Sequence, residues 1–223
     1  MPVSFKRKGI VFVLSAPSGT GKSTLIDGLR AVQPEILLSV SCTTRRQRPG
    51  EKRGRHYHFV TRRQFLQMKK KGEFAEWAKV HNFLYGTPRK LLESCINNGR
   101  DILLDIDVQG ARKIKRVYPQ AVSIFVLPPS MRELRRRLSR RGTDDRETIR
   151  RRLANAEGEI RRIFEYDYFI INRKVIESVR LLRVIIKAES ARTLRVKGWS
   201  FSGPSTGSTR RNDEQGIKNR RVG

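Results

Sequence analysis

The amino-acid sequence predicts an α/β protein built on a parallel sheet with helices on both faces. Short apolar runs of strand length alternate along the chain with longer segments in which apolar residues recur at helical spacing. A glycine-containing loop joins the first apolar run to the first helical segment. With 223 residues, of which 37% are hydrophobic, the chain is long enough for one large domain with smaller lobes.

The first predicted strand covers residues 10–14, a continuous apolar run typical of a strand that is buried on both faces. A loop over 15–21 follows, and apolar residues at helical spacing then predict a helix over 23–32, which Pro34 ends. The chain therefore opens as strand, loop and helix.

Further strands are predicted at 102–107, 122–127 and 168–171. Helical patterns lie between and after them, at 87–98, 109–117, 130–140, 146–165 and 174–190. A helix between two strands carries the chain back to the end of the sheet where the first strand began. The alternation of strands and helices therefore favours parallel strands. The interval 39–88 is different: it combines short alternating stretches with a helix near 61–71, and we interpret it as an inserted lobe.

The net charge of the chain indicates which chemical classes of partner it favours. Lys and Arg number 49 and Asp and Glu 21, so the net charge of +28 favours anionic partners such as nucleotides, nucleic acid or acidic lipid. No apolar run reaches the length of about 18 residues that a membrane span needs. Two cysteines, Cys42 and Cys95, predict inert thiols in a reducing cytoplasm. The sequence is also compatible with a homo-oligomer.

The loop after the first strand approximates the pattern G-x-x-x-x-G-K-[ST], with alanine at the first glycine position. Small residues allow backbone N–H groups to point at phosphate oxygens, and the helix that follows adds its positive end. Lys22 is expected to reach the β- and γ-phosphates of a nucleotide, and the Ser23 hydroxyl to ligate Mg²⁺. The predicted ATP-binding loop consists of Ala16, Pro17, Ser18, Gly19, Thr20, Gly21, Lys22 and Ser23.

Three further strings at 39–51, 74–87 and 104–110 complete a pattern that closely resembles the guanylate kinase family of the bacterial type. The match runs in order from about Ile10 to Glu189. The resemblance implies the P-loop nucleoside-monophosphate-kinase fold. It also implies Mg²⁺-dependent transfer of the γ-phosphoryl group of ATP to GMP, which gives ADP and GDP without a covalent enzyme intermediate.

The resemblance assigns GMP binding to the inserted lobe. Guanidinium groups bind phosphate oxygens in a fork and a phenol donates one more bond, while a carboxylate accepts from both guanine donors at once. The GMP phosphate is assigned to Arg45, Arg48, Tyr57 and Tyr85. The base is assigned to Glu76, Ser41 and Thr87, and Asp105 and Asp107 are placed beside GMP and Mg²⁺.

The region 130–165 resembles the family's lid, and its Arg137, Arg141 and Arg152 match the catalytic arginines. Cations there offset the charge that spreads over the phosphoryl oxygens in the transition state. Asn172 matches a residue near the adenine pocket. Gln47 stands where the family often has proline, and we expect it to loosen that loop without removing a phosphate ligand.

The chain is thus divided into a core (1–38, 89–129 and 166–197), a lobe that binds GMP (39–88), a lid (130–165) and a tail (198–223). The tail is rich in Gly, Ser and Thr and carries more basic than acidic residues, which predicts disorder and weak contact with nucleic acid.

Two alternatives remain open. A non-catalytic guanylate-kinase-like interaction module tends to lose the lysine of the phosphate loop or the lid arginines, and this chain has both. A ribose-bisphosphate kinase, or a nucleic-acid-binding P-loop protein, has no use for a guanine-reading set of Ser41, Glu76 and Tyr85.

Overall fold

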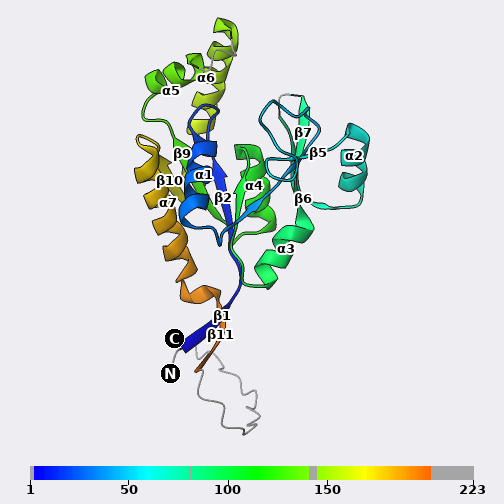
Figure 1. Cartoon of the computed structure of the whole chain (residues 1–223), viewed down its shortest axis with the longest axis vertical. Coiled ribbons are helices and arrows are strands. Elements are labelled where there is room, and N and C mark those ends of the chain that lie inside the picture. The colour runs from blue at the N-terminus through cyan, green and yellow to red at the C-terminus, as the bar shows by residue number, and fades with distance from the viewer. Residues whose placement is uncertain (1–2, 81, 141–144, 202–223) are drawn as a thin grey trace, which may run out of the picture.

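The computed structural model describes residues 3–80, 82–140 and 145–201. Its centre is a five-stranded sheet in the order β10-β9-β2-β8-β3, in which every neighbouring pair is parallel. The strands are β2 (Val11–Ser15), β3 (Leu37–Ser39), β8 (Ile102–Asp105), β9 (Val122–Leu127) and β10 (Tyr168–Ile171). The predicted α/β class with a parallel sheet is confirmed (Figure 1).

Helices cover both faces of this sheet because side chains alternate across each strand. Phe12 and Leu14 point into a core formed with α1 (Lys22–Val32) and α7 (Val175–Ser190). Val11 and Val13 point into a second core formed with α3 (Arg89–Asn97) and α4 (Val108–Val117). The central strand is therefore buried on both faces, as its continuous apolar run predicts.

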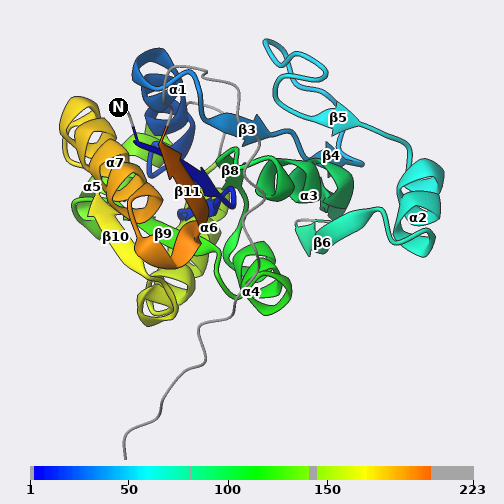
Figure 2. The same cartoon turned by 90° about the horizontal axis from the view of Figure 1, so that it is seen from below.

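The interval between β3 and α3 folds beside the core, as Figures 1 and 2 show. It forms a second sheet in the order β5-β4-β7-β6. Its elements are β4 (Cys42–Thr43), β5 (His58–Phe59), α2 (Arg62–Lys70), β6 (Phe74–Val80) and β7 (Phe83–Pro88). Phe65 of α2 stacks on Phe74 of β6 with 4.5 Å between ring centroids, so this lobe has a small core of its own.

The region after β9 forms α5 (Met131–Ser139), α6 (Arg146–Ile160) and the short helix η1 (Ile163–Glu165). Ser130 caps α5 and Asp145 caps α6, each accepting a backbone N–H from three residues on. Leu134 and Leu138 of α5 pack on Leu153 of α6 in a separate cluster. Figure 1 shows this helix pair standing at one end of the molecule.

Two features of the fold differ from the sequence prediction. The edge strand β3 was not predicted, because three residues are too few for a periodic pattern. The two ends of the described chain also pair: β1 (Val3–Arg7) runs antiparallel to β11 (Val196–Phe201), which follows η2 (Thr193–Arg195). We call this pair the terminal ribbon; it projects from the end of the molecule opposite the lid (Figure 1).

The terminal ribbon corrects the predicted tail boundary at residue 198. Residues 198–201 are paired with residues 3–6 and do not form a disordered tail. The sequence did not reveal this because strand pairing between the two ends of a chain leaves no local signal. Residues 202–223 lie outside the described residues, and their disorder stays a prediction. In the part of the chain that the structure describes, none of the helices has the length and apolar character to cross a membrane.

Truncation tests what the ribbon contributes. A chain ending at Lys197 loses the partners of residues 3–6, whereas one ending at Phe201 keeps them. Because a two-stranded ribbon is marginally stable by itself, its loss should cost about 1 kcal/mol, or about 2–4 °C in the thermal midpoint. The chain ending at Phe201 should unfold at the midpoint of the full chain. Equal midpoints for the two truncations would show that the ribbon adds no stability.

Candidate active site

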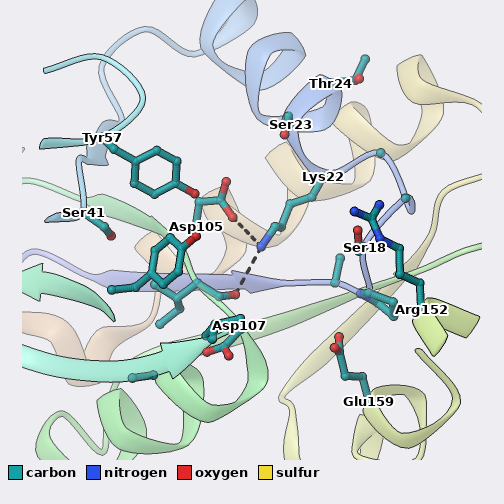
Figure 3. Close-up of a pocket in the computed structure, with 18 of the residues that line it drawn as sticks. Ser18, Lys22, Ser23, Thr24, Ser41, Tyr57, Asp105, Asp107, Arg152 and Glu159 are labelled. Atoms are coloured by element: carbon teal, nitrogen blue, oxygen red, sulfur yellow. Dashed lines mark hydrogen bonds and ion pairs between the residues drawn. The ribbon is translucent and has the colours of Figure 1, made fainter. Parts of the chain in front are cut away.

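A cavity of about 610 Å³ opens where β2 and β8 end, and its walls come from the core, the lobe and the lid (Figure 3). The phosphate loop, residues 16–23, lines one side, and Asp105 and Asp107 line the floor. The carboxyl ends of parallel strands are where ligands bind in α/β folds. The cavity is therefore the candidate active site.

Two glycines let the phosphate loop pass between its neighbours. Gly19 and Gly21 have φ values of 90° and 97°, a left-handed region that side chains rarely adopt. A Cβ on Gly19 would lie 2.8 Å from Leu138 Cδ2, and one on Gly21 2.7 Å from Asn172 Nδ2. The loop conformation thus depends on glycine for two reasons, backbone torsion and space.

Lys22 reaches from the start of α1 to the end of β8. Its Nζ lies 2.5 Å from Asp105 Oδ1 and donates to the carbonyl oxygen of Ile106 at 3.3 Å. Ser23 and Thr24 also line the cavity, at the amino end of α1. Thr24 was not predicted; it follows directly on the recognised pattern.

Thr20 of the phosphate loop does not line the cavity, and neither do Asn172 and Arg137, which lie behind the loop. The carbonyl oxygen of Thr20 accepts from Asn172 Nδ2 at 2.8 Å and from Arg137 Nη1 at 2.9 Å. Arg137 also donates to the carbonyl oxygen of Asn172 and to Glu133. Asn172 and Arg137, both predicted site residues, therefore brace the loop from behind.

The lobe brings its predicted phosphate-binding residues to a neighbouring cavity of about 290 Å³, lined by Ser41, Arg45, Arg48, Tyr57, Tyr85 and Asp105. Arg45 is buried and forms a fork with Glu51, at 2.7 and 3.0 Å. Burial alone would raise the pKa of Glu51, but hydrogen bonds from Arg45 and from the backbone N–H of Arg48 lower it. Glu51 thus orients a predicted phosphate ligand, a role that sequence reasoning missed.

Gln47 does not loosen this loop as expected. Its Nε2 donates to the carbonyl oxygen of Glu51 at 2.6 Å, across the turn that carries Arg48. The side-chain amide therefore replaces the rigidity of a proline ring with a hydrogen bond.

Glu76 lies in β6 with only 6% of its surface exposed. Thr87 of β7 donates a hydrogen bond to Glu76 Oε1 at 2.7 Å. Burial raises the pKa of Glu76 to about 7; the bond from Thr87 opposes this rise and the charge of Asp107 adds to it. A buried carboxylate in the wall of the cavity is suited to a ligand with N–H donors.

Asp107 does not end the strand, as the sequence suggested, because β8 stops at Asp105. Asp107 is the N-cap of α4, and its Oδ1 accepts from the backbone N–H of Gly110 at 2.9 Å. Asp107 therefore has a structural role as a helix cap, and it also lines the cavity; its predicted role beside GMP and Mg²⁺ stays a prediction.

The lid contributes Arg152 and Glu159, both from α6, to the cavity (Figure 3). Arg141, the third predicted catalytic arginine, lies outside the described residues. Glu159 was not predicted. Burial and the charge of Asp107 raise its pKa to about 7, while Lys22 and Arg162 lower it. Its only sequence signal is its position seven residues after Arg152.

A parallel sheet, a phosphate loop at the end of its central strand and a lobe and lid around one cavity define the class of P-loop nucleotide kinases. The family model for guanylate kinase matches residues 8–189. The chain belongs to the guanylate kinase family and is an enzyme.

Similar proteins and a solved structure support the same family. The chain is 48% identical over 191 residues to a guanylate kinase of Geobacter metallireducens, covering 86% of this chain and 94% of that protein. It is 42% identical to a guanylate kinase of Thermotoga maritima, covering 86% and 98%. The crystal structure of guanylate kinase from Anaplasma phagocytophilum superposes with a TM-score of 0.72 at 39% identity, over 87% of this chain and 93% of that one.

The raised pKa of Glu76 predicts that this residue costs stability at alkaline pH. Its folded-state pKa of about 7 lies above the ordinary value of 4.5, so stability present at low pH is lost as pH rises through 7. Glu76→Gln keeps the acceptor for Thr87 without the charge. It should raise the thermal midpoint at pH 8 by about 5 °C, on the order of 2 kcal/mol, and leave it unchanged at pH 4.5.

Glu73→Gln is the matched control, since Glu73 is exposed immediately before the same strand. Its midpoint should follow that of the unmodified chain at both pH values. A stabilisation by Glu76→Gln that does not depend on pH would contradict the buried-charge explanation.

Proposed function

We propose that this chain transfers the γ-phosphoryl group of ATP to a phosphate oxygen of GMP, giving ADP and GDP. The observation that carries the proposal is the pair formed by a buried carboxylate, Glu76, and the ammonium of Lys22, which line the same cavity. The first suits the N–H edge of guanine and the second suits nucleotide phosphates. The family supports the same reaction, because guanylate kinases use ATP and GMP.

On the ATP side, backbone N–H groups of the phosphate loop and the amino end of α1 bind the phosphates. Lys22 reaches the β- and γ-phosphates either by breaking its ion pair with Asp105 or by keeping that pair and offering a further N–H. Asn172 holds the loop from behind through the Thr20 carbonyl. Arg137 braces the loop through the same carbonyl, and we assign it to ATP through a guanidinium N–H beyond the three that it uses in the fold.

On the GMP side, Glu76 accepts from the two guanine donors and Ser41 adds a bond to the base. Thr87 holds Glu76 in place. Arg45 and Arg48 bind the phosphate with Tyr57 and Tyr85, whose rings meet edge to face at 5.8 Å. The Glu51 fork keeps Arg45 in the required orientation.

The residues present fit a magnesium ion that arrives with ATP. Ser23 and Asp105 supply oxygen donors, which Mg²⁺ prefers. Within the described residues no group of three or more acids, histidines or cysteines could hold a metal by itself. The nucleotide phosphates would therefore supply most ligands, and the ion would neutralise phosphate charge when bound.

The reaction needs positioning and charge more than a base, because the GMP phosphate is already anionic. Arg152 faces the cavity from the lid, and we assign it to the charge that develops on the transferred phosphoryl group. Arg141 is assigned the same task by the family resemblance. The proposed division of labour is a core that binds ATP, a lobe that binds GMP and a lid that carries arginines.

Several wider expectations stay proposals. We propose a cytoplasmic location from the two buried free thiols. Residues 202–223 are proposed to add weak, salt-dependent contact with nucleic acid. A homo-oligomer also stays a proposal that is compatible with this function.

A coupled ADP-release assay with GMP, AMP, UMP and ribose bisphosphate tests the substrate assignment. GMP should be strongly preferred. Glu76→Gln should lower kcat/KM for GMP by about 100-fold or more, because its NH₂ opposes the guanine donors and a mispaired buried group costs a few kcal/mol. The KM for ATP should change less than about twofold. Equal losses for both substrates would show that Glu76 does not read the base.

The two predicted catalytic arginines that the structure describes are both expected to lower turnover when removed. Arg137→Ala removes three hydrogen bonds to the loop, to Asn172 and to Glu133, so it should lower both kcat and the thermal midpoint. Arg152→Ala removes a cation from the cavity wall and should lower kcat by about 100-fold. Wild-type turnover in Arg152→Ala would remove this residue from the mechanism.

A further inference from the structure

Gly110 ends the string 104–110 and lies in the first turn of α4, where its backbone N–H donates to Asp107 Oδ1 at 2.9 Å. Glycine is less favourable than alanine inside a helix. The backbone torsions of Gly110 do not call for glycine, because its φ is not among the positive values. Gly110 is buried and does not itself line the cavity. The reason for glycine at this position therefore lies in what packs against it.

Carboxylate oxygens occupy the side of Gly110 on which a side chain would stand. A Cβ built there would lie 3.2 Å from Glu76 Oε2, and 3.3 Å from both Asp107 Oδ1 and Ile106 Cβ. These separations are shorter than ordinary van der Waals contact, so a methyl group fits only if a neighbour moves by a few tenths of an ångström. The Glu76 carboxylate thus lies against the backbone of α4, in a space that glycine leaves open.

Contacts on three sides keep Glu76 from moving away from α4. On the side of β7, its Oε1 accepts from Thr87 at 2.7 Å. The preceding residue, Ala75, packs in the core cluster that includes α4. The following residue, Trp77, offers its carbonyl oxygen to Lys113 of α4. The strand β6 is therefore fixed along α4 on both sides of Glu76, and the two elements lie in contact (Figure 1).

We propose that Gly110 is a specificity-determining positioning residue: the space left by its missing side chain holds the Glu76 carboxylate at the depth where both oxygens accept from guanine. The inference rests on the proposed function and names the part of the core that sets its substrate preference. The two guanine donors lie on one edge of a planar ring, so a displaced carboxylate keeps one hydrogen bond and lengthens the other. A base with a single donor at that edge tolerates the same displacement.

The test is the choice between GMP and IMP, whose base lacks the N2 amine of guanine, by the full chain and by Gly110→Ala. In the variant, kcat/KM for GMP should fall about tenfold, the effect of losing one hydrogen bond. The kcat/KM for IMP and the KM for ATP should change less than about twofold. An equal loss for GMP and IMP, or no loss for either, would overturn the proposal, because general damage to the fold does not distinguish the two bases.

Two other helical glycines provide matched controls. A Cβ on Gly158 of α6 would meet nothing within 4 Å, so Gly158→Ala should leave the kinetic constants for GMP and IMP unchanged. A Cβ on Gly28 of α1 would lie 2.7 Å from Val179 Cγ2, so Gly28→Ala should lower the thermal midpoint through crowding. Its ratio of kcat/KM for GMP to that for IMP should equal the ratio of the full chain. A fall of this ratio in Gly28→Ala would contradict a specific role of Gly110.

The contact itself is tested with Glu76→Asp, whose shorter side chain draws the carboxylate away from Gly110. Adding Gly110→Ala to Glu76→Asp should lower the ratio for GMP and IMP no further. The change in thermal midpoint caused by Gly110→Ala should be about 2–4 °C more favourable with Asp at position 76 than with Glu. Effects that simply add would overturn the proposal.

If Gly110→Ala alone does not fold, the double variant should fold, and its failure to do so would also overturn the proposal. The thermal midpoints test the contact without any turnover. A full chain that does not phosphorylate GMP would therefore refute the proposed function separately from the role of Gly110.

Discussion

The carbonyl oxygen of Thr20 is the point on which the arrangement of this molecule depends. It lies in the phosphate loop between two glycines with left-handed torsions, and it accepts hydrogen bonds from Asn172 after β10 and from Arg137 of the lid helix α5. Leu138 of the same helix packs against Gly19. One loop thus joins the central strand, the last strand of the sheet and the lid, so the conformation that binds phosphate also places the lid.

Charge is distributed in a way that serves anionic substrates. In a chain with a net charge of +28, several of the acids at the cavity are not neutralised by arginine. Asp105 pairs with Lys22, Asp107 caps a helix, and burial raises the pKa of Glu76 and that of Glu159 to about 7. The cations that would neutralise these acids are Lys22 and the lid arginines, which the reaction needs for phosphate. The site is therefore poised to accept phosphate charge instead of being satisfied internally.

Much of the fold and of the candidate site could be predicted from local patterns. The six helices predicted mainly outside the inserted lobe and the strands at 122–127 and 168–171 agree with the structure to within about five residues, because apolar residues recur regularly along them. Other features depend on contacts between distant residues and leave no local pattern. These include the edge strand β3, the terminal ribbon, the Glu51 fork on Arg45 and the bond from Gln47 that stiffens its loop.

The class of fold, the phosphate loop and the family could be predicted from the order of residues, since each is encoded in contiguous residues with specific backbone requirements or spacing. How these residues work together follows from contacts that exist in the folded chain. The tertiary structure placed Arg137 behind the loop and Arg152 in the cavity, made Asp107 a helix cap, and brought Glu159 from the lid to the wall of the same cavity. The reason is physical: a hydrogen bond or a desolvated charge is defined by distances between segments far apart in the chain, which the order of residues does not contain.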